Sequence, residues 1–122
     1  MSERTLIEVD LTFRPVVQGG RDFPDDILND RKYRPHIVIG DINHRQPIVA
    51  DGNYHLENYL GIAFMNGPSH IEPGKSCLAQ ALLIYAPAKE YSAAVPGATF
   101  TLREGGRIVG HGRIKKRWTE IQ

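Results

Sequence analysis

The stretch that decides the fold is residues 99–114, TFTLREGGRIVGHGRI. Apolar and polar residues alternate before and after Gly105-Gly106, which is typical of two antiparallel strands. A Gly-Gly pair between two such runs predicts a type I′ hairpin turn, because both central residues then need a positive φ. Gly110 and Gly112 interrupt the second strand, and we expect them to let it bend as a barrel closes.

The same glycines nearly match a phosphate-binding loop, because Gly105 is followed by four residues and then by Gly110. Such a loop continues with Lys and Ser or Thr, which serve the phosphate and magnesium, and a helix begins directly after it. Here His111 and Gly112 follow, on a strand-like segment. The glycines therefore indicate a turn and a bulge rather than a nucleotide site.

The rest of the chain also has a dominant period of two. In residues 7–13 the odd positions are apolar and the even positions polar, which predicts a half-buried strand. Residues 37–39, 54–64 and 77–85 add extended runs, with Gly and Pro marking the turns between them. These runs favour an all-β fold, a closed six-stranded antiparallel β-barrel, since closure removes exposed edges. A β-sandwich is the alternative.

Length and composition place the chain among globular proteins. Its 122 residues make one ordinary domain, with 41% hydrophobic and 24% charged residues. A net charge of +1 removes the argument for nucleic acid that a strongly basic surface would give. Cys77 is the one cysteine, so no internal disulfide can form. Without a membrane-length apolar run or a secretory signal, we expect a cytoplasmic protein with no membrane contact.

The histidines and acidic residues do not have the spacing of a catalytic or metal site. The histidines lack the short spacings that metal sites use. Acidic residues gather in a loop insertion at 22–32, where a solvated, partner-facing patch is expected rather than a catalytic pair. We therefore expect no enzyme activity, no metal, no nucleotide and no cofactor. The histidines are His36, His44, His55, His70 and His111.

Basic residues crowd the last hairpin and the basic C-terminal end at 113–122. On regular strand geometry Arg113, Lys115 and Arg117 share one face. Such a strip either contacts phosphates or protects a solvated edge strand by its charge. Trp118 lies among these residues and either stacks on a base or packs against the barrel. The basic set is Arg103, Arg107, Arg113, Lys115, Lys116 and Arg117.

Four segments, in the same order along the chain, resemble the C-terminal domain, domain III, of bacterial elongation factor Tu. Residues 102–112, LREGGRIVGHG, are similar to the family's terminal Arg-Glu-Gly-Gly-Arg-x-Val-Gly-x-Gly signature. Residues 19–21, 33–35 and 72–74 are similar to its Gly-Gly-Arg turn, its Tyr-Arg-Pro strand opening and its Pro-Gly turn. The resemblance covers roughly residues 4–117. It implies a six-stranded antiparallel barrel, in a chain too short to hold the factor's GTPase domain.

Carried over residue by residue, the resemblance preserves only some of the family's RNA contacts, so it supports the fold more strongly than tRNA binding. In the factor, domain III contacts the T-stem of aminoacyl-tRNA, the nucleotide-exchange partner and the GTPase domain. Glu104 and Gly105 match positions at the T-stem edge, and Arg21 matches a basic contact. Each Asp near a phosphate path opposes binding by about 1 kcal/mol. Three positions depart from the family's His, Gln and Thr: Asp22, His36 and Asn43.

Three functions follow as hypotheses. The first is a non-catalytic binding module that engages a protein partner, favoured by the acidic insertion and the near-neutral charge; one version is a decoy or immunity-type mimic that intercepts a toxin which uses the factor. The second is an RNA-binding accessory domain that recognises the tRNA T-stem, and a small enzyme on a recruited barrel is a third. The candidate contact residues are Arg21, Asp22, His36, Asn43, Arg103, Glu104, Gly105, Arg107, Arg113, Lys115, Lys116 and Trp118.

Overall fold

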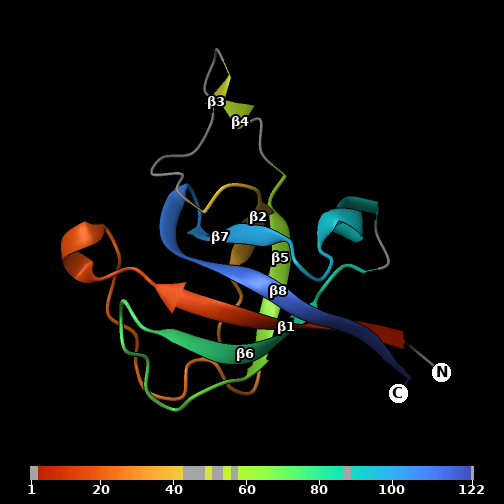
Figure 1. Cartoon of the computed structure of the whole chain (residues 1–122), viewed down its shortest axis with the longest axis horizontal. Helices are drawn as coiled ribbons and strands as arrows, with labels where there is room; N and C mark the ends of the chain where they lie inside the picture. The colour runs from red at the N-terminus through yellow and green to blue at the C-terminus, as the bar shows by residue number, and fades with distance from the viewer. Residues whose placement is uncertain (1–2, 43–48, 51–53, 56–57, 87–88, 122) are drawn as a thin grey trace.

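A computed structural model describes residues 3–42, 49–50, 54–55, 58–86 and 89–121. Within these residues six strands form a closed barrel in the order β1-β6-β5-β2-β7-β8, and neighbouring strands are antiparallel (Figure 1). The predicted barrel is confirmed, and the alternative sandwich is wrong. The barrel strands are β1 Glu3–Phe13, β2 His36–Ile39, β5 Leu60–Asn66, β6 Ser76–Leu83, β7 Thr99–Glu104 and β8 Arg107–Ile121.

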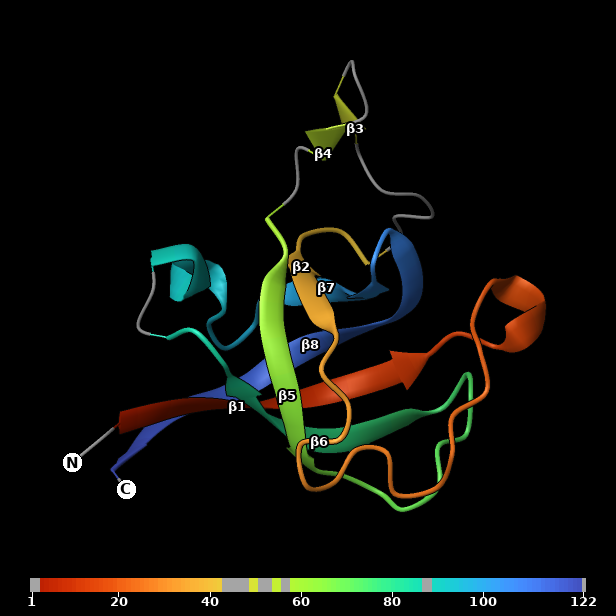
Figure 2. The same ribbon diagram turned by 180° about the vertical axis from the view of Figure 1, so that it is seen from behind.

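Four short elements accompany the barrel. Strands β3 (Val49–Ala50) and β4 (Tyr54–His55) form a separate two-stranded sheet. Two 3-10 turns, η1 (Val16–Gln18) and η2 (Lys89–Ala93), follow β1 and precede β7. They lie on opposite sides of the barrel in both views, η1 in orange and η2 in teal (Figure 1 and Figure 2).

Strand β1 shows how the period of two builds the core. Its residues 7, 9, 11 and 13 are at most 1% exposed, whereas residues 8, 10 and 12 are partly exposed. The inward side chains of β1 join one buried apolar cluster with side chains from the other five barrel strands. The alternation seen in the sequence is therefore an inward and outward alternation across the barrel wall.

The turn between β7 and β8 differs from the predicted type. Gly105 has a φ of 58°, but Gly106 is not among the residues with a positive φ. A type I′ turn needs a positive φ at both central residues, so that prediction is wrong; a positive φ at the first alone is the pattern of a type II′ turn. The predicted bulge is present, where the register of the hairpin shifts between Leu102 and Arg103.

Gly110 and Gly112 lie where β8 passes close to β1. A Cβ on Gly112 would be 2.4 Å from the carbonyl oxygen of Asp10 and 2.7 Å from the ring of Phe100. A Cβ on Gly110 would be 2.7 Å from the carbonyl oxygen of Thr12. The close approach of two backbones, rather than a positive φ, is the reason for glycine at both positions.

The substitution Gly112→Ala should lower the free energy of unfolding by about 3 kcal/mol, because the new methyl group must displace β1 or the Phe100 ring. Gly105→Ala is the matched control, since its Cβ would meet nothing within 4 Å. There the strain of a positive φ costs about 1 kcal/mol. Urea unfolding of both variants measures the difference, and equal losses would contradict the close approach.

Candidate functional site

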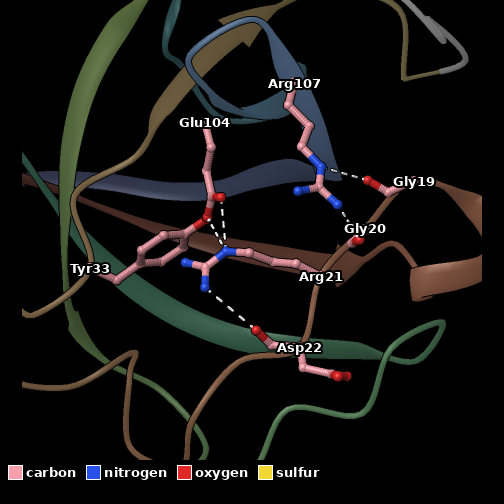
Figure 3. Close-up of polar contacts among 7 residues, drawn as sticks. All are labelled: Gly19, Gly20, Arg21, Asp22, Tyr33, Glu104 and Arg107. Atoms are coloured by element: carbon pink, nitrogen blue, oxygen red, sulfur yellow. Dashed lines mark hydrogen bonds and ion pairs between the residues drawn. The ribbon is translucent and has the colours of Figure 1, made fainter.

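Three of the four segments that resemble the factor family meet at one place (Figure 3). Glu104, just before the hairpin turn, accepts hydrogen bonds on both carboxylate oxygens from Arg21 Nε, at 2.8 and 2.9 Å. The Tyr33 hydroxyl donates to the same carboxylate at 2.5 Å. The contact joins the Gly-Gly-Arg, Tyr-Arg-Pro and Arg-Glu-Gly-Gly-Arg segments, which are far apart in the sequence.

Arg107, on the other side of the hairpin turn, holds the backbone that follows η1. Its Nε donates to the Gly19 carbonyl oxygen at 2.8 Å, and its Nη2 donates to the Gly20 carbonyl oxygen. Gly20 has no room for a side chain, because a Cβ would lie 1.9 Å from the Arg14 carbonyl oxygen. We call the following four residues the clamp: Arg21, Tyr33, Glu104 and Arg107.

Burial keeps the Tyr33 hydroxyl of the clamp protonated. Burial and the hydrogen bond to Glu104 raise the pKa of the Tyr33 hydroxyl far above its ordinary value, so the hydroxyl stays a donor. The Tyr33 ring stacks on Phe64 with centroids 5.8 Å apart, and the Arg21 guanidinium lies 4.2 Å from the Phe23 ring centroid. The clamp residues predicted to contact a partner thus have their polar groups engaged within the chain.

Arg103 is fully buried between the sheet and the segment before β5. Its Nε donates to Thr101 Oγ1 at 2.8 Å, and its Nη1 donates to the Tyr59 hydroxyl at 3.1 Å. His36 lies directly opposite Arg103, with its ring 5.9 Å from that of Tyr59. Contrary to the prediction, Arg103 offers no surface to a partner, whereas His36 is partly exposed.

A bulge interrupts the predicted basic face of β8. The register of β8 against β1 shifts at Lys115, and residues beyond a bulge exchange faces. Arg117 therefore lies opposite the inward-facing Ile7 and donates to the carbonyl oxygens of residues 91 and 94, at 2.6 and 3.0 Å. The prediction that Arg113, Lys115 and Arg117 share one face is wrong.

The basic residues that stay exposed on β8 stand beside acids. Arg113 lies directly opposite Asp10, and Lys116 lies directly opposite Glu8. Lys115 is exposed at the bulge. The β1–β8 surface is consequently a ladder of mixed charge rather than a basic strip, and opposite charges across two strands stabilise their pairing.

The other residues predicted to contact a partner differ in how exposed they are. Trp118 is partly buried and lies opposite Leu6, which is 3% exposed, so its position supports the alternative of packing against the barrel. Asp22 is exposed, and Gly105 is exposed at the hairpin tip. Asn43 lies outside the described residues.

The acidic insertion at 22–32 is anchored to the barrel. Leu28 within it is fully buried, and the Asn29 side chain donates to and accepts from the backbone of Gly67, at 3.3 Å in each case. The aspartates of the insertion are exposed, as expected for a solvated patch. Because Leu28 belongs to the core, deleting the insertion would test stability as well as binding.

Sequence reasoning missed an exposed apolar turn, η1, and a pocket beside it. Val16 and Val17 of η1 are 53% and 92% exposed. A pocket of about 510 Å³ is lined by residues of η1 and the segment that leads into it, by the end of β1, by the start of β6 and by His111 within β8. Two neighbouring valines between the strand predicted at residues 7–13 and the Gly-Gly-Arg turn at 19–21 could have indicated an exposed apolar turn. The pocket depends on the pairing of distant strands and had no local signal.

No family model matches the chain, and no curated protein is significantly similar to it. These comparisons therefore do not identify the protein. The resemblance to domain III stays a prediction that rests on its four sequence segments.

Among the described residues no helix is long and apolar enough to cross a membrane. In the same part of the chain, no group of three or more His, Cys, Asp or Glu side chains could hold a metal ion. Burial raises the pKa of the Cys77 thiol, which disfavours the reactive thiolate.

The raised pKa of Tyr33 predicts how stability depends on pH. A group with a raised folded-state pKa contributes stability that is present below its unfolded pKa, about 10 for tyrosine, and is lost as pH rises above it. The wild-type chain should therefore lose more stability between about pH 9 and pH 11 than Tyr33→Phe does. Urea unfolding at several pH values measures this difference.

Tyr33→Phe should also cost about 1 kcal/mol near neutral pH, where it removes the hydrogen bond to Glu104. Tyr85→Phe, at a side chain that is 68% exposed, is the matched control and should follow the wild-type pH dependence. Identical pH curves for the wild type and Tyr33→Phe would show that the clamp does not depend on this hydroxyl.

Proposed function

We propose that the chain is a non-catalytic binding module whose protein partner contacts the η1 turn. The observation that carries the proposal is the exposure of two neighbouring valines, with Val17 92% and Val16 53% exposed. A single exposed apolar side chain is ordinary on a protein surface. Two β-branched side chains together on a turn that projects from the barrel, beside a pocket, favour a contact with another protein (Figure 1).

The turn is held in place by contacts within the chain. Arg107 donates to the carbonyl oxygens of Gly19 and Gly20. Three backbone N–H groups of the turn donate to the carbonyl oxygens of Pro15 and Val16, at 2.9–3.1 Å. A surface that is already ordered loses less conformational entropy on association, which supports its use in binding.

The charge distribution favours a protein over RNA as the partner. Among the basic residues first assigned to RNA, Arg103, Arg107 and Arg117 donate to groups of the chain itself. Arg113 and Lys116 stand opposite acids. Binding to RNA draws its affinity from several cations that neutralise phosphates, and this chain has a net charge of +1.

The resemblance to domain III indicates which partners to examine first. Proteins that recognise elongation factor Tu form that class, and a decoy or immunity-type mimic that intercepts a toxin is the most specific version. Such a role would be performed in the cytoplasm. The clamp supports this version because it keeps the hairpin tip and the turn at 19–21 in one arrangement.

Val17→Asp should lower the recovery of the partner from a lysate of the source organism by at least about tenfold, because a carboxylate replaces the apolar contact surface. Val95→Asp is the matched control, since this valine is 44% exposed and follows η2 on the opposite side of the barrel. Quantitative mass spectrometry of the proteins retained by each immobilised chain measures the effect.

Equal retention of every protein by the wild type and Val17→Asp would contradict the proposal. The RNA alternative is tested on the same preparations by a tRNA gel shift. Binding that weakens steeply with salt and disappears when Lys115 and Lys116 are changed to Glu would put RNA in the place of the protein partner. No shift at low salt would remove the RNA alternative.

A further inference from the structure

The pocket of about 510 Å³ beside η1 has a size that suits a small ligand or a side chain of a partner. It lies on the outer side of the barrel wall, where β1, β6 and β8 meet the segment that leads into η1. Pro15 gives it apolar surface. The lining side chains that carry hydrogen-bond donors are Thr12, Arg14, Gln18, Ser76 and His111.

Strand register brings these donors together. Thr12 of β1 lies directly opposite Ser76 of β6 and His111 of β8, so the three form one row across three strands. Arg14 follows β1 and is 9% exposed, and its Nη1 donates to a backbone carbonyl oxygen of β8 at 3.4 Å. Gln18 is exposed at the rim, on the η1 turn itself.

The composition of the lining favours an anion. None of the described residues that line the pocket is acidic. Asp10 lines an adjoining pocket of about 170 Å³ that shares Thr12, Ser76 and His111, and it lies opposite Arg113. A carboxylate accepts hydrogen bonds without donating any, so it suits the Arg14 guanidinium, which only donates. The hydroxyl, amide and imidazole groups of the lining both donate and accept, and they can add donors to the same carboxylate.

We propose that this pocket receives the carboxylate of an aspartate or glutamate side chain of the protein partner. The inference rests on the proposed function and specifies its partner. Pro15 and Gln18 flank Val16 and Val17, so a partner segment with its acidic side chain in the pocket has its next residues within reach of the valines. The partner segment therefore carries an acidic residue beside an apolar one, and the charge sets its orientation.

A capped peptide in which glutamate stands beside valine tests the pocket, with the isotope-labelled full chain observed by NMR. Saturating shifts at Gln18 and His111 are expected. The same peptide with glutamine in place of glutamate should bind at least about tenfold more weakly, because the charge-assisted hydrogen bonds are lost.

Two variants with the same change of charge separate the pocket from the rest of the surface. Gln18→Glu places a carboxylate at the rim and should weaken binding of the glutamate peptide at least about tenfold. Asn58→Asp changes an exposed residue that does not line the pocket and should leave binding unchanged. Thermal unfolding of both variants confirms that each one is folded.

Equal binding of the glutamate and glutamine peptides, or shifts confined to other residues, would overturn the inference. Inorganic phosphate is titrated in parallel. Saturation by phosphate at Gln18 and His111 without saturation by the glutamate peptide would also overturn it, in favour of a phosphorylated ligand.

The pocket and the proposed function can fail separately. If the glutamate peptide does not bind but Val17→Asp loses the partner, the pocket inference is wrong and the protein contact at η1 stands. If the peptide binds and Val17→Asp retains every protein, the pocket stands and the contact at η1 is wrong.

Discussion

Strands β1 and β8 approach each other so closely that only glycine fits at two positions of β8. At Gly110 and Gly112 the carbonyl oxygens of β1 occupy the space that a Cβ would need. Strand β1 pairs with β8 over its whole length and with β6 on its other edge, so the closure of the barrel passes through it. The ring of Phe100 packs next to Gly112, filling core space that no side chain of β8 takes. The close approach of these two backbones thus constrains both the register of β8 against β1 and the packing of Phe100 beside it.

The β1–β8 register then determines what the hairpin tip can reach. It carries Glu104 and Arg107 to the turn after β1, where the carboxylate and the guanidinium are both engaged. The same register places Thr12 between Ser76 and His111 on the outer side of the wall. The clamp, the η1 turn and the pocket are therefore linked, because a change in the β1–β8 pairing would alter all three.

The sequence predicted the barrel because alternation and turn chemistry are properties of single segments, readable without knowing their neighbours. It could not predict features that arise when strands pair. The bulge at Lys115 forms only against β1, and it moves Arg117 to the inner face. Arg103 is buried, and its guanidinium donates to Thr101 and to Tyr59, which lies far from it in the sequence. Gly105 begins a turn whose type depends on the register of the joined strands, since Gly-Gly permits both mirror types.

The residues on which the predicted resemblance to the factor family rests mainly hold the frame of the barrel. The side chains of the clamp bond to one another and to the backbone of the turn after β1, and these bonds need no partner (Figure 3). Such contacts define a fold, and one fold can serve many unrelated functions. What this barrel binds must therefore depend on exposed side chains that the frame positions but that do not themselves hold the frame together. Val16 and Val17 are such side chains. Arg107 binds the backbone that follows their turn, and both side chains remain exposed. The residues that carry the predicted resemblance thus influence binding indirectly, because they determine the position of the exposed valines.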